Sequence, residues 1–312
     1  MTTTLAPSQA ARPAASTWLF RFAALFAVLT LLHIKWGALV VSSGSGMAFL
    51  DWPLSRGSLW PAGMTIFEFV EHSHRVYGAL LGFLAIVLAA WTNRVDSRPW
   101  LRKLTFWLVP LFLVQGLLGG LGVTLGQAGG ITHAGMAIAH GVLGQVTLCV
   151  QVVVMVALSS AFDSTTEGDA DAVRATRKLS TVALGAVFVQ LLIGAIFRHT
   201  NVQGVLWVHI TMALVVSVLI LLAAAHASAR FGDQAPGFRR TAVAFYTLLL
   251  AQLVLGFIAI AVRRFKDRSS IEDPVQVLLV STHVLVGASI FALATLLVVR
   301  AWRNLVPGGP RE

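Results

Sequence analysis

The chain has 312 residues, of which 57% are hydrophobic and 12% are charged. Soluble domains carry roughly a quarter charged residues, so this composition excludes a water-soluble enzyme and predicts an all-α polytopic membrane protein. The formal net charge of +10 does not indicate nucleic-acid binding, because the Lys and Arg residues lie in short segments beside apolar runs. The single cysteine, Cys149, excludes any intrachain disulfide.

The first 17 residues are polar and small, which predicts a disordered tail over residues 1–17. The apolar run that begins at Trp18 has no convincing cleavage site, so we expect a retained helix rather than a signal peptide. Eight apolar runs are long enough to cross a bilayer, and Pro110 makes the third a candidate for a kink. The predicted spans cover residues 18–41, 66–91, 104–125, 133–158, 179–198, 204–226, 240–262 and 275–300.

These spans predict two similar four-helix halves, at 18–158 and 179–303, joined by a polar cytoplasmic linker at 159–178. Each odd span carries a Gln-x3-Gly motif, or His-x3-Gly in the first, and each even span carries a histidine near its start. Close packing of membrane helices would explain the glycines but not the matched histidines. The motif pairs are His33/Gly37, Gln115/Gly119, Gln190/Gly194 and Gln252/Gly256.

The positions of Lys and Arg predict how the chain crosses the membrane. If the N-terminus is cytoplasmic, 15 of the 23 Lys and Arg residues lie on the cytoplasmic side. We therefore expect a multi-pass protein of the cell inner membrane with both termini in the cytoplasm. A basic cluster in the last outer loop opposes this count; its members are Arg263, Arg264, Lys266 and Arg268.

The histidines of the even spans are the strongest functional signal in the sequence. Each lies about 5 to 8 residues, or ~8–12 Å, inside the start of its span, where an ionisable group is costly. Two imidazoles from facing helices in each half suit the axial positions of a haem iron better than a compact zinc or copper site. The four residues are His74, His140, His209 and His283. We expect structural roles for His33, His72, His133, His199 and His226, with His72 and His199 at the outer interface.

Six stretches, in order, resemble the haem A synthase family of the CtaA type and together extend over most of the chain. They are GALV at 37–40, SGSGMAFLDWPLSRG at 43–57, Glu71-x-x-His74-Arg75, AHGVLGQ at 139–145, WVHI at 207–210 and THVLVG at 282–287. The resemblance implies an oxidoreductase that converts the methyl group of haem O into the formyl group of haem A by successive hydroxylations, for cytochrome oxidase assembly. It implies haem b as cofactor, membrane lipid, haem O synthase and an electron acceptor as partners, and it is compatible with a homo-oligomer.

Carried over to this chain, the resemblance assigns each predicted half a haem. The half at 18–158 would bind the substrate haem O between His74 and His140, with Arg75 contacting its propionates. Glu71 and His74 would be catalytic, because a carboxylate beside a haem can take a proton or stabilise a developing cation. The alternative role for Glu71 is a structural salt bridge to Arg75, four residues on.

The half at 179–303 would hold haem b between His209 and His283, so that all four histidines are axial ligands of haem iron. The basic cluster at 263–268 would then reach the haem propionates, with lipid headgroups or Glu272 and Asp273 as alternative partners.

One stretch departs from the family's pattern. Many members carry a cysteine pair in the first outer loop, where this chain has Phe49 and Ser55. No disulfide can hold that loop here, so we expect Asp51, Trp52 and Pro53 to hold it by packing at the membrane interface.

Two other functions fit parts of the pattern. A haem b-binding electron-transfer protein without chemistry on the haem would need both haems to be permanent and Glu71 to be dispensable. A transporter with a histidine proton relay would need spans broken near the middle of the membrane, and only Pro110 hints at such a break.

Overall fold

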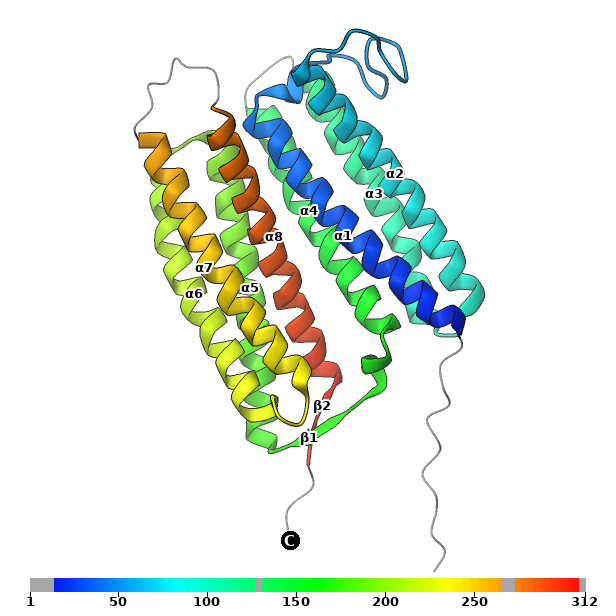
Figure 1. Cartoon of the computed structure of the whole chain (residues 1–312), viewed down its shortest axis with the longest axis vertical. Coiled ribbons are helices and arrows are strands. Elements are labelled where there is room, and N and C mark those ends of the chain that lie inside the picture. Colours follow the sequence, from blue (N-terminus) through cyan, green and yellow to red (C-terminus); the bar gives the residue numbers. More distant parts are fainter. Residues whose placement is uncertain (1–13, 127–130, 265–272, 309–312) are drawn as a thin grey trace, which may run out of the picture.

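The computed structural model describes residues 14–126, 131–264 and 273–308. Within these ranges eight helices are long and apolar enough to span a membrane, which confirms the predicted all-α polytopic membrane protein (Figure 1). They are α1 (Ala14–Ser42), α2 (Ile66–Val95), α3 (Pro99–Gly126), α4 (Ile131–Leu158), α5 (Ala170–Thr200), α6 (Gln203–Phe231), α7 (Pro236–Arg264) and α8 (Pro274–Arg303).

The helices form two four-helix bundles that lie side by side, α1–α4 in one and α5–α8 in the other (Figure 1). Each bundle has its own buried apolar core, with residues such as Phe26 and Leu81 in the first and Phe245 in the second. Helices α1 and α4 pack against α8, and α4 also packs against α5. A small apolar cluster of Ala27, Leu148 and Ala288 joins α1, α4 and α8, so the two bundles share a packed interface.

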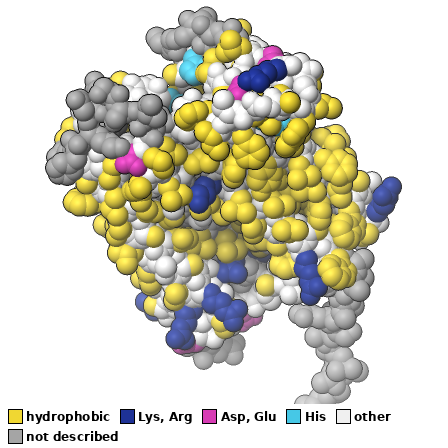
Figure 2. Space-filling model, turned by 45° about the horizontal axis from the view of Figure 1, so that its top comes forward, with side chains coloured by type: hydrophobic (Ala, Val, Ile, Leu, Met, Phe, Trp, Pro, Cys, Tyr) yellow, Lys and Arg dark blue, Asp and Glu magenta, His cyan; other side chains and the backbone are white. Residues whose placement is uncertain are grey.

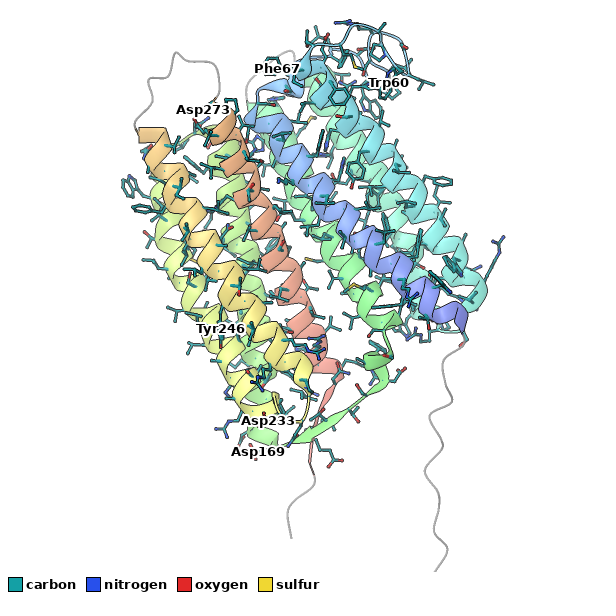
Figure 3. All side chains as sticks on the ribbon, viewed as in Figure 1. Trp60, Phe67, Asp169, Asp233, Tyr246 and Asp273 are labelled. Atoms are coloured by element: carbon teal, nitrogen blue, oxygen red, sulfur yellow. The ribbon has the colours of Figure 1, made fainter. Side chains whose placement is uncertain are left out.

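The two ends of the molecule differ in structure. The loop end carries the 43–65 loop with the short helix η1 (Ser45–Met47), and Trp60, Phe67 and Asp273 lie there (Figure 3). The strand end carries η2 (Ser160–Asp163) and the short strands β1 (Thr166–Gly168) and β2 (Leu305–Pro307), which pair in parallel with Thr166 opposite Leu305. Hydrophobic side chains cover the middle of the face between these ends, as expected of a surface in contact with lipid (Figure 2).

Several element boundaries differ from the predicted ones. Helix α1 begins at Ala14, so residues 14–17 are helical rather than part of a tail, while residues 1–13 lie outside the described ranges. Helix α5 begins at Ala170 instead of 179, because Asp169 accepts a hydrogen bond from the Ala172 N–H and Val173 is fully buried. Helix α3 continues through Pro110.

Candidate functional site

A capping box fixes the start of α2, the helix that carries most of the candidate site. The Thr65 hydroxyl accepts a hydrogen bond from the Glu68 N–H at 3.3 Å, and the Glu68 carboxylate accepts one from the Thr65 N–H at 2.8 Å. Because this start is fixed, Glu71 lies about one turn and His74 about two turns inside the helix. Both therefore lie near the loop end of the first bundle.

Three histidines meet in the first bundle. The rings of His33 on α1 and His74 on α2 stack with centroids 4.1 Å apart and planes 9° apart. The ring of His140 on α4 lies edge-to-face with His74, with centroids 6.5 Å apart and planes at 81°. Tyr77 makes an edge contact with His33, with centroids 4.9 Å apart and planes at 68°, and donates a hydrogen bond to the Leu29 carbonyl at 2.8 Å. The structure thus brings His74 and His140 together and adds His33, for which the sequence predicts only a structural role.

Each of the four predicted histidines rests against a glycine of the preceding helix. A Cβ atom on Gly37, Gly194 or Gly256 would crowd the histidine ring carbon Cε1, whereas one on Gly119 would be in ordinary van der Waals contact with His140. The separations between that Cβ position and Cε1 are 2.9 Å for Gly37 and His74, 3.5 Å for Gly119 and His140, 2.8 Å for Gly194 and His209, and 3.1 Å for Gly256 and His283. The recurring glycine therefore makes room for an imidazole, in addition to any role in helix packing.

The glutamine of each motif contacts the same histidine. Gln190 donates from its side-chain amide to His209 Nδ1 at 3.1 Å and to the His209 carbonyl at 3.0 Å. Gln252 donates to His283 Nε2 at 3.1 Å. In the first bundle the Gln115 carbonyl accepts from His140 Nδ1 at 3.1 Å. The glutamine side chain thus contacts the histidine of the next helix in both motifs of the second bundle, while Gln115 of the first bundle makes the contact through its backbone carbonyl.

The second bundle brings His209 of α6 and His283 of α8 within electrostatic range of each other. Among the described residues, no group of three or more His, Cys, Asp or Glu side chains is arranged to hold a bare metal ion. A set of two imidazoles is instead the donor set of a haem iron with two axial histidines.

Glu71 is buried and fully engaged. Its Oε1 forms an ion pair with Arg75, and its Oε2 accepts a hydrogen bond from the Phe49 N–H at 3.0 Å. The Arg75 guanidinium also donates to three loop carbonyls, those of Asp51 at 2.6 Å, Leu54 at 2.9 Å and Phe49 at 3.3 Å. The salt bridge that the sequence leaves open is therefore present, and it ties the 43–65 loop to α2.

The two loop positions that carry cysteines in many relatives both bind α2. Phe49 contacts Glu71 through its N–H, and the Ser55 hydroxyl lies 3.0 Å from His72 Nδ1. His72 is only 4% exposed, so the prediction that it faces the outer interface is wrong. Trp52, as predicted, anchors the loop by packing, since its ring covers Gly120 of α3 so closely that no Cβ would fit there.

Asp51 closes the turn at the tip of this loop. Its carboxylate accepts hydrogen bonds from the Gly57 N–H at 2.8 Å and the Arg56 N–H at 3.0 Å. The Gly57 N–H is the main reason why the pKa of Asp51 lies below its usual value. Arg56 and Gly57 both have positive φ, at 51° and 66°, so the turn is left-handed at these two residues.

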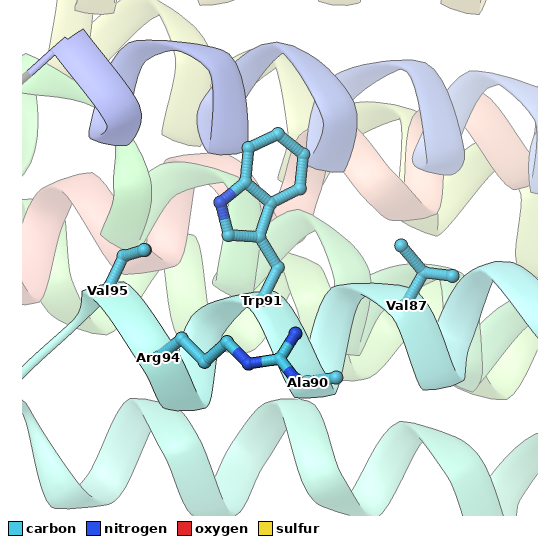
Figure 4. Close-up of a pocket in the computed structure, with 5 residues that line it drawn as sticks. All are labelled: Val87, Ala90, Trp91, Arg94 and Val95. Atoms are coloured by element: carbon cyan, nitrogen blue, oxygen red, sulfur yellow. The ribbon is translucent and has the colours of Figure 1, made fainter.

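An open groove on α2 is separate from the histidines. Val87 lies 13 residues after His74, or roughly 20 Å along the helix, towards the strand end. The groove is lined by Val87, Ala90, Trp91, Arg94 and Val95 (Figure 4). Its mostly apolar lining and its distance from Glu71 leave it outside the candidate site.

Two residues near the site, His33 and Arg198, make contacts that are not predicted from the sequence. His33 replaces glutamine in the first motif, and that substitution is the visible signal for its stacking on His74. Arg198 is a cation at the loop end of α5 and donates to Ala38 and Ser42 of α1. The side chains of the basic cluster at 263–268 lie outside the described residues.

The similarity of the chain to known proteins agrees with this geometry. The family model COX15-CtaA, described as a cytochrome oxidase assembly protein, matches residues 62–202. A protein named "Heme A synthase" from Alkalihalophilus pseudofirmus is 34% identical over 110 residues, which cover 33% of this chain and 37% of that protein. One of the same name from Halalkalibacterium halodurans is 35% identical over 123 residues, covering 39% and 40%. A third, from Staphylococcus carnosus, is 26% identical over 311 residues, covering 89% and 93%.

The chain is similar to the COX15-CtaA family over residues 62–202. Its matches span only about two fifths of the first two relatives but nearly the whole of the third. The segment matched by the COX15-CtaA model contains Glu71, His74, Arg75 and His140, the residues that the structure gathers at the loop end of the first bundle.

Proposed function

We propose that this protein is a haem A synthase, an oxidoreductase that converts the methyl group of haem O into the formyl group of haem A by successive hydroxylations. The observation that carries the proposal is the histidine pair in each bundle, with every imidazole seated on a glycine of the preceding helix. The names of the relatives support the same activity and a role in cytochrome oxidase assembly.

The first bundle is the proposed site for the substrate haem O. Its two ligand candidates, His74 and His140, have ring centroids 6.5 Å apart. An iron bound by both rings would need two metal–nitrogen bonds of about 2 Å each, which is about 4 Å of that separation. Arg75 contributes to substrate binding through the 43–65 loop, since both of its terminal nitrogens hold loop carbonyls at this end of the bundle.

The second bundle is the proposed site for haem b, with His209 and His283 as axial ligands. The residues fit such a group, because imidazole is a ligand that haem iron accepts and two glycines leave space beside the rings. Two buried polar atoms, Nδ1 of His283 and Oε1 of Gln252, have no hydrogen-bond partner among the residues that the structure describes. When bound, haem b would supply one-electron redox chemistry.

Glu71 is the proposed catalytic carboxylate. It precedes His74 by about one turn of α2, on the same side of the helix, and its position is fixed by Arg75 and the Phe49 N–H. A carboxylate held there can take a proton released from the substrate's methyl carbon and can stabilise positive charge as electrons leave. The 43–65 loop above it limits the access of water.

The proposed location is the cell inner membrane, with both termini in the cytoplasm. The odd and even helices alternate in direction, so the start of α1 and the end of α8 lie on the same side of the bundle, and most Lys and Arg residues belong to that side. Haem O synthase and an electron acceptor are the partners that the proposed reaction requires, since one supplies the substrate and the other removes electrons.

Extraction and chromatography of haem from the purified protein test this function. We expect haem O or haem A together with haem b, because one bundle binds substrate and the other binds cofactor. His209→Ala and His283→Ala should each lose the low-spin haem b spectrum, since each removes an axial ligand. A protein that contains only haem b in both bundles, or one that keeps a normal low-spin spectrum in both variants, would contradict the proposal.

A further inference from the structure

Arg198 lies beside the proposed haem b site. It follows Gln190 by eight residues and Gly194 by four, so the three residues form one stripe along α5. Gln190 and Gly194 both contact His209, which places Arg198 about one helical turn, ~6 Å, beyond that ring towards the loop end. Arg198 also interacts electrostatically with His283. Its guanidinium therefore belongs to the surroundings of both candidate ligands.

The described residues offer Arg198 no carboxylate within ion-pair distance. Its Nη2 donates to two neutral acceptors, the Ala38 carbonyl at 2.7 Å and the Ser42 hydroxyl at 2.9 Å, both on α1. Arg198 is half-buried within a membrane-spanning helix. Burying a cation within a membrane-spanning helix costs free energy, and such a cation is normally paired with an anion. We therefore expect a negatively charged group beside Arg198.

No other repeat carries a cation at this position. The residues equivalent to Arg198 in the other odd helices are Val41, Val123 and Ile260. The fold therefore needs no arginine here, because three equivalent positions pack with aliphatic side chains. The cation is specific to the second bundle, beside His209 and His283.

We propose that Arg198 binds a propionate carboxylate of the tetrapyrrole held between His209 and His283, and that its contacts with Ala38 and Ser42 connect this site to α1 of the first bundle. The inference rests on the proposed function, which places a haem between these histidines. Guanidinium binds carboxylate with two parallel hydrogen bonds, and a haem carries its propionates along one edge.

The contact with α1 gives the arginine a second consequence. Ser42 is the last residue of α1, and the 43–65 loop that holds Glu71 begins at the next residue. The Arg198 side chain thus lies beside two regions. One is the proposed cofactor site, and the other is the start of the loop that covers the proposed substrate site. Arg198 is a positioning residue for both bundles.

Two measurements on the purified haem-loaded protein test this inference, the haem b midpoint potential and the rate of haem transfer to apomyoglobin. In Arg198→Gln we expect a lower potential, because a nearby cation favours the reduced haem, and transfer faster by about tenfold, because a charge-assisted hydrogen bond is lost. Arg198→Lys keeps the charge and should retain most of the potential. Equal potentials in the Gln and Lys variants, both shifted from wild type, would overturn the electrostatic role.

Arg300→Gln is the matched control. Within the described part of the chain, Arg300 also donates only to neutral groups on another helix, the Gly237 carbonyl and the Thr241 hydroxyl, but at the strand end. Its loss should leave the potential and the transfer rate as in wild type. An equal change in both arginine variants, or no change in Arg198→Gln, would overturn the proposal.

The lipid supplies a competing anion, so the measurements are made in nanodiscs of neutral phosphatidylcholine and of anionic lipid. An effect of Arg198→Gln in both supports a haem propionate, whereas an effect confined to anionic lipid assigns Arg198 to a headgroup and overturns the proposal. Wild-type protein without any haem b would refute the proposed function and this inference together. Normal haem b in wild type with an unaltered Arg198→Gln variant refutes the inference alone.

Discussion

Glu71 has the structural role that the sequence offers as one alternative, and the catalytic role is our proposal. The ion pair with Arg75 is present, and the same guanidinium holds carbonyls of the 43–65 loop, so the carboxylate is part of the structure of the site. Its position about one turn from His74 also suits proton transfer at the proposed substrate. Removing one partner of a buried ion pair costs about 3–5 kcal/mol, so a test of catalysis needs a substitution of the same shape.

Glu71→Gln is that substitution. The amide oxygen can still accept from the Phe49 N–H, so we expect a folded protein that keeps its haem b. Formation of haem A should fall by at least about a hundredfold, in line with the loss of a general base. Glu68→Gln, one turn earlier on α2, is the control and should retain activity. Normal haem A formation by Glu71→Gln would show that the residue is structural only.

At this scale the sequence suggests candidate residues but not their contacts. The four histidines and Glu71 are visible because ionisable groups within apolar spans are rare. The stacking of His33 on His74 and the burial of His72 under the loop depend on how a loop and a neighbouring helix fold over α2, which helical spacing does not encode. The cysteine pattern of relatives points to the loop but not to the hydrogen bonds that hold it here.

Helix α5 illustrates the contact that repeats along the fold. Gln190 donates a hydrogen bond to His209 of the next helix, and Gly194 leaves space for the His209 ring. The same arrangement recurs between α7 and α8. A side chain at the glycine would push the ring away from its place. The glycine is therefore expected to matter more for haem binding than for the stability of the helix.

Gly194→Ala tests this expectation. The added Cβ would lie 2.8 Å from Cε1 of His209, so the ring must move. Overpacking of this kind costs about 1–3 kcal/mol, and we expect haem b retention to weaken by about tenfold or more. Gly185→Ala in the same helix meets no atom within 4 Å and should keep a wild-type haem content. Equal haem contents in the two variants would argue against the glycine's role.

The 43–65 loop depends on the charge of Asp51. Hydrogen bonds from the Gly57 and Arg56 N–H groups favour the ionised carboxyl and lower its pKa. The stabilisation is therefore fully present above the usual pKa of an aspartate and is lost as the pH falls through the lowered value. At neutral pH the turn should be closed.

Asp51→Ala should open this turn at neutral pH. We expect trypsin to cleave after Arg56 several times faster than in wild type, because the backbone N–H groups of residues 56 and 57 lose their acceptor. In wild type, protection of the Gly57 amide from hydrogen exchange should persist at pH 5 and be lost in strong acid. Asp233→Ala at the strand end serves as the control. Unchanged cleavage in Asp51→Ala would show that the Arg75 contacts alone hold the loop.

The ends of the helices and the two short strands are the parts of the fold that the sequence does not predict. Apolar runs locate all eight helices, but polar ends such as 170–178 are assigned to a linker because hydropathy does not register a capped polar turn. Strands β1 and β2 have three residues each and pair across most of the second bundle's sequence, so no local pattern predicts them. Their pairing is reinforced by Asn304, whose side chain donates to carbonyls of Ala161 and Ser164.

The whole molecule consists of two bundles that pack together along α1, α4 and α8. The pairing of β1 with β2 adds a contact at the strand end. The apolar cluster of Ala27, Leu148 and Ala288 supplies the packed contact, and Arg198 adds a polar contact near the loop end. The two proposed haem sites therefore lie in separate bundles that share one packed interface. This arrangement suits electron transfer between a substrate and a cofactor that must not exchange places.

The orientation in the membrane follows from the same architecture. Most Lys and Arg residues lie towards the strand end, so we propose from the positive-inside rule that this end faces the cytoplasm and the loop end faces outside. Leu59 in the 43–65 loop is 81% exposed, and Thr165 before β1 is also exposed. Cys149 is buried in α4, so wild type provides an unlabelled background.

Single-cysteine labelling tests this orientation. In intact spheroplasts, a membrane-impermeant maleimide should label Leu59→Cys and leave Thr165→Cys unlabelled, with Thr165→Cys reacting only after lysis. The wild-type chain should stay unlabelled throughout, because Cys149 is buried. Labelling of Thr165→Cys in intact spheroplasts would show that the true topology is the inverse of the proposed one. It would then place Glu71, the loop over it and Arg198 on the cytoplasmic side, so haem O would reach its proposed site from that face.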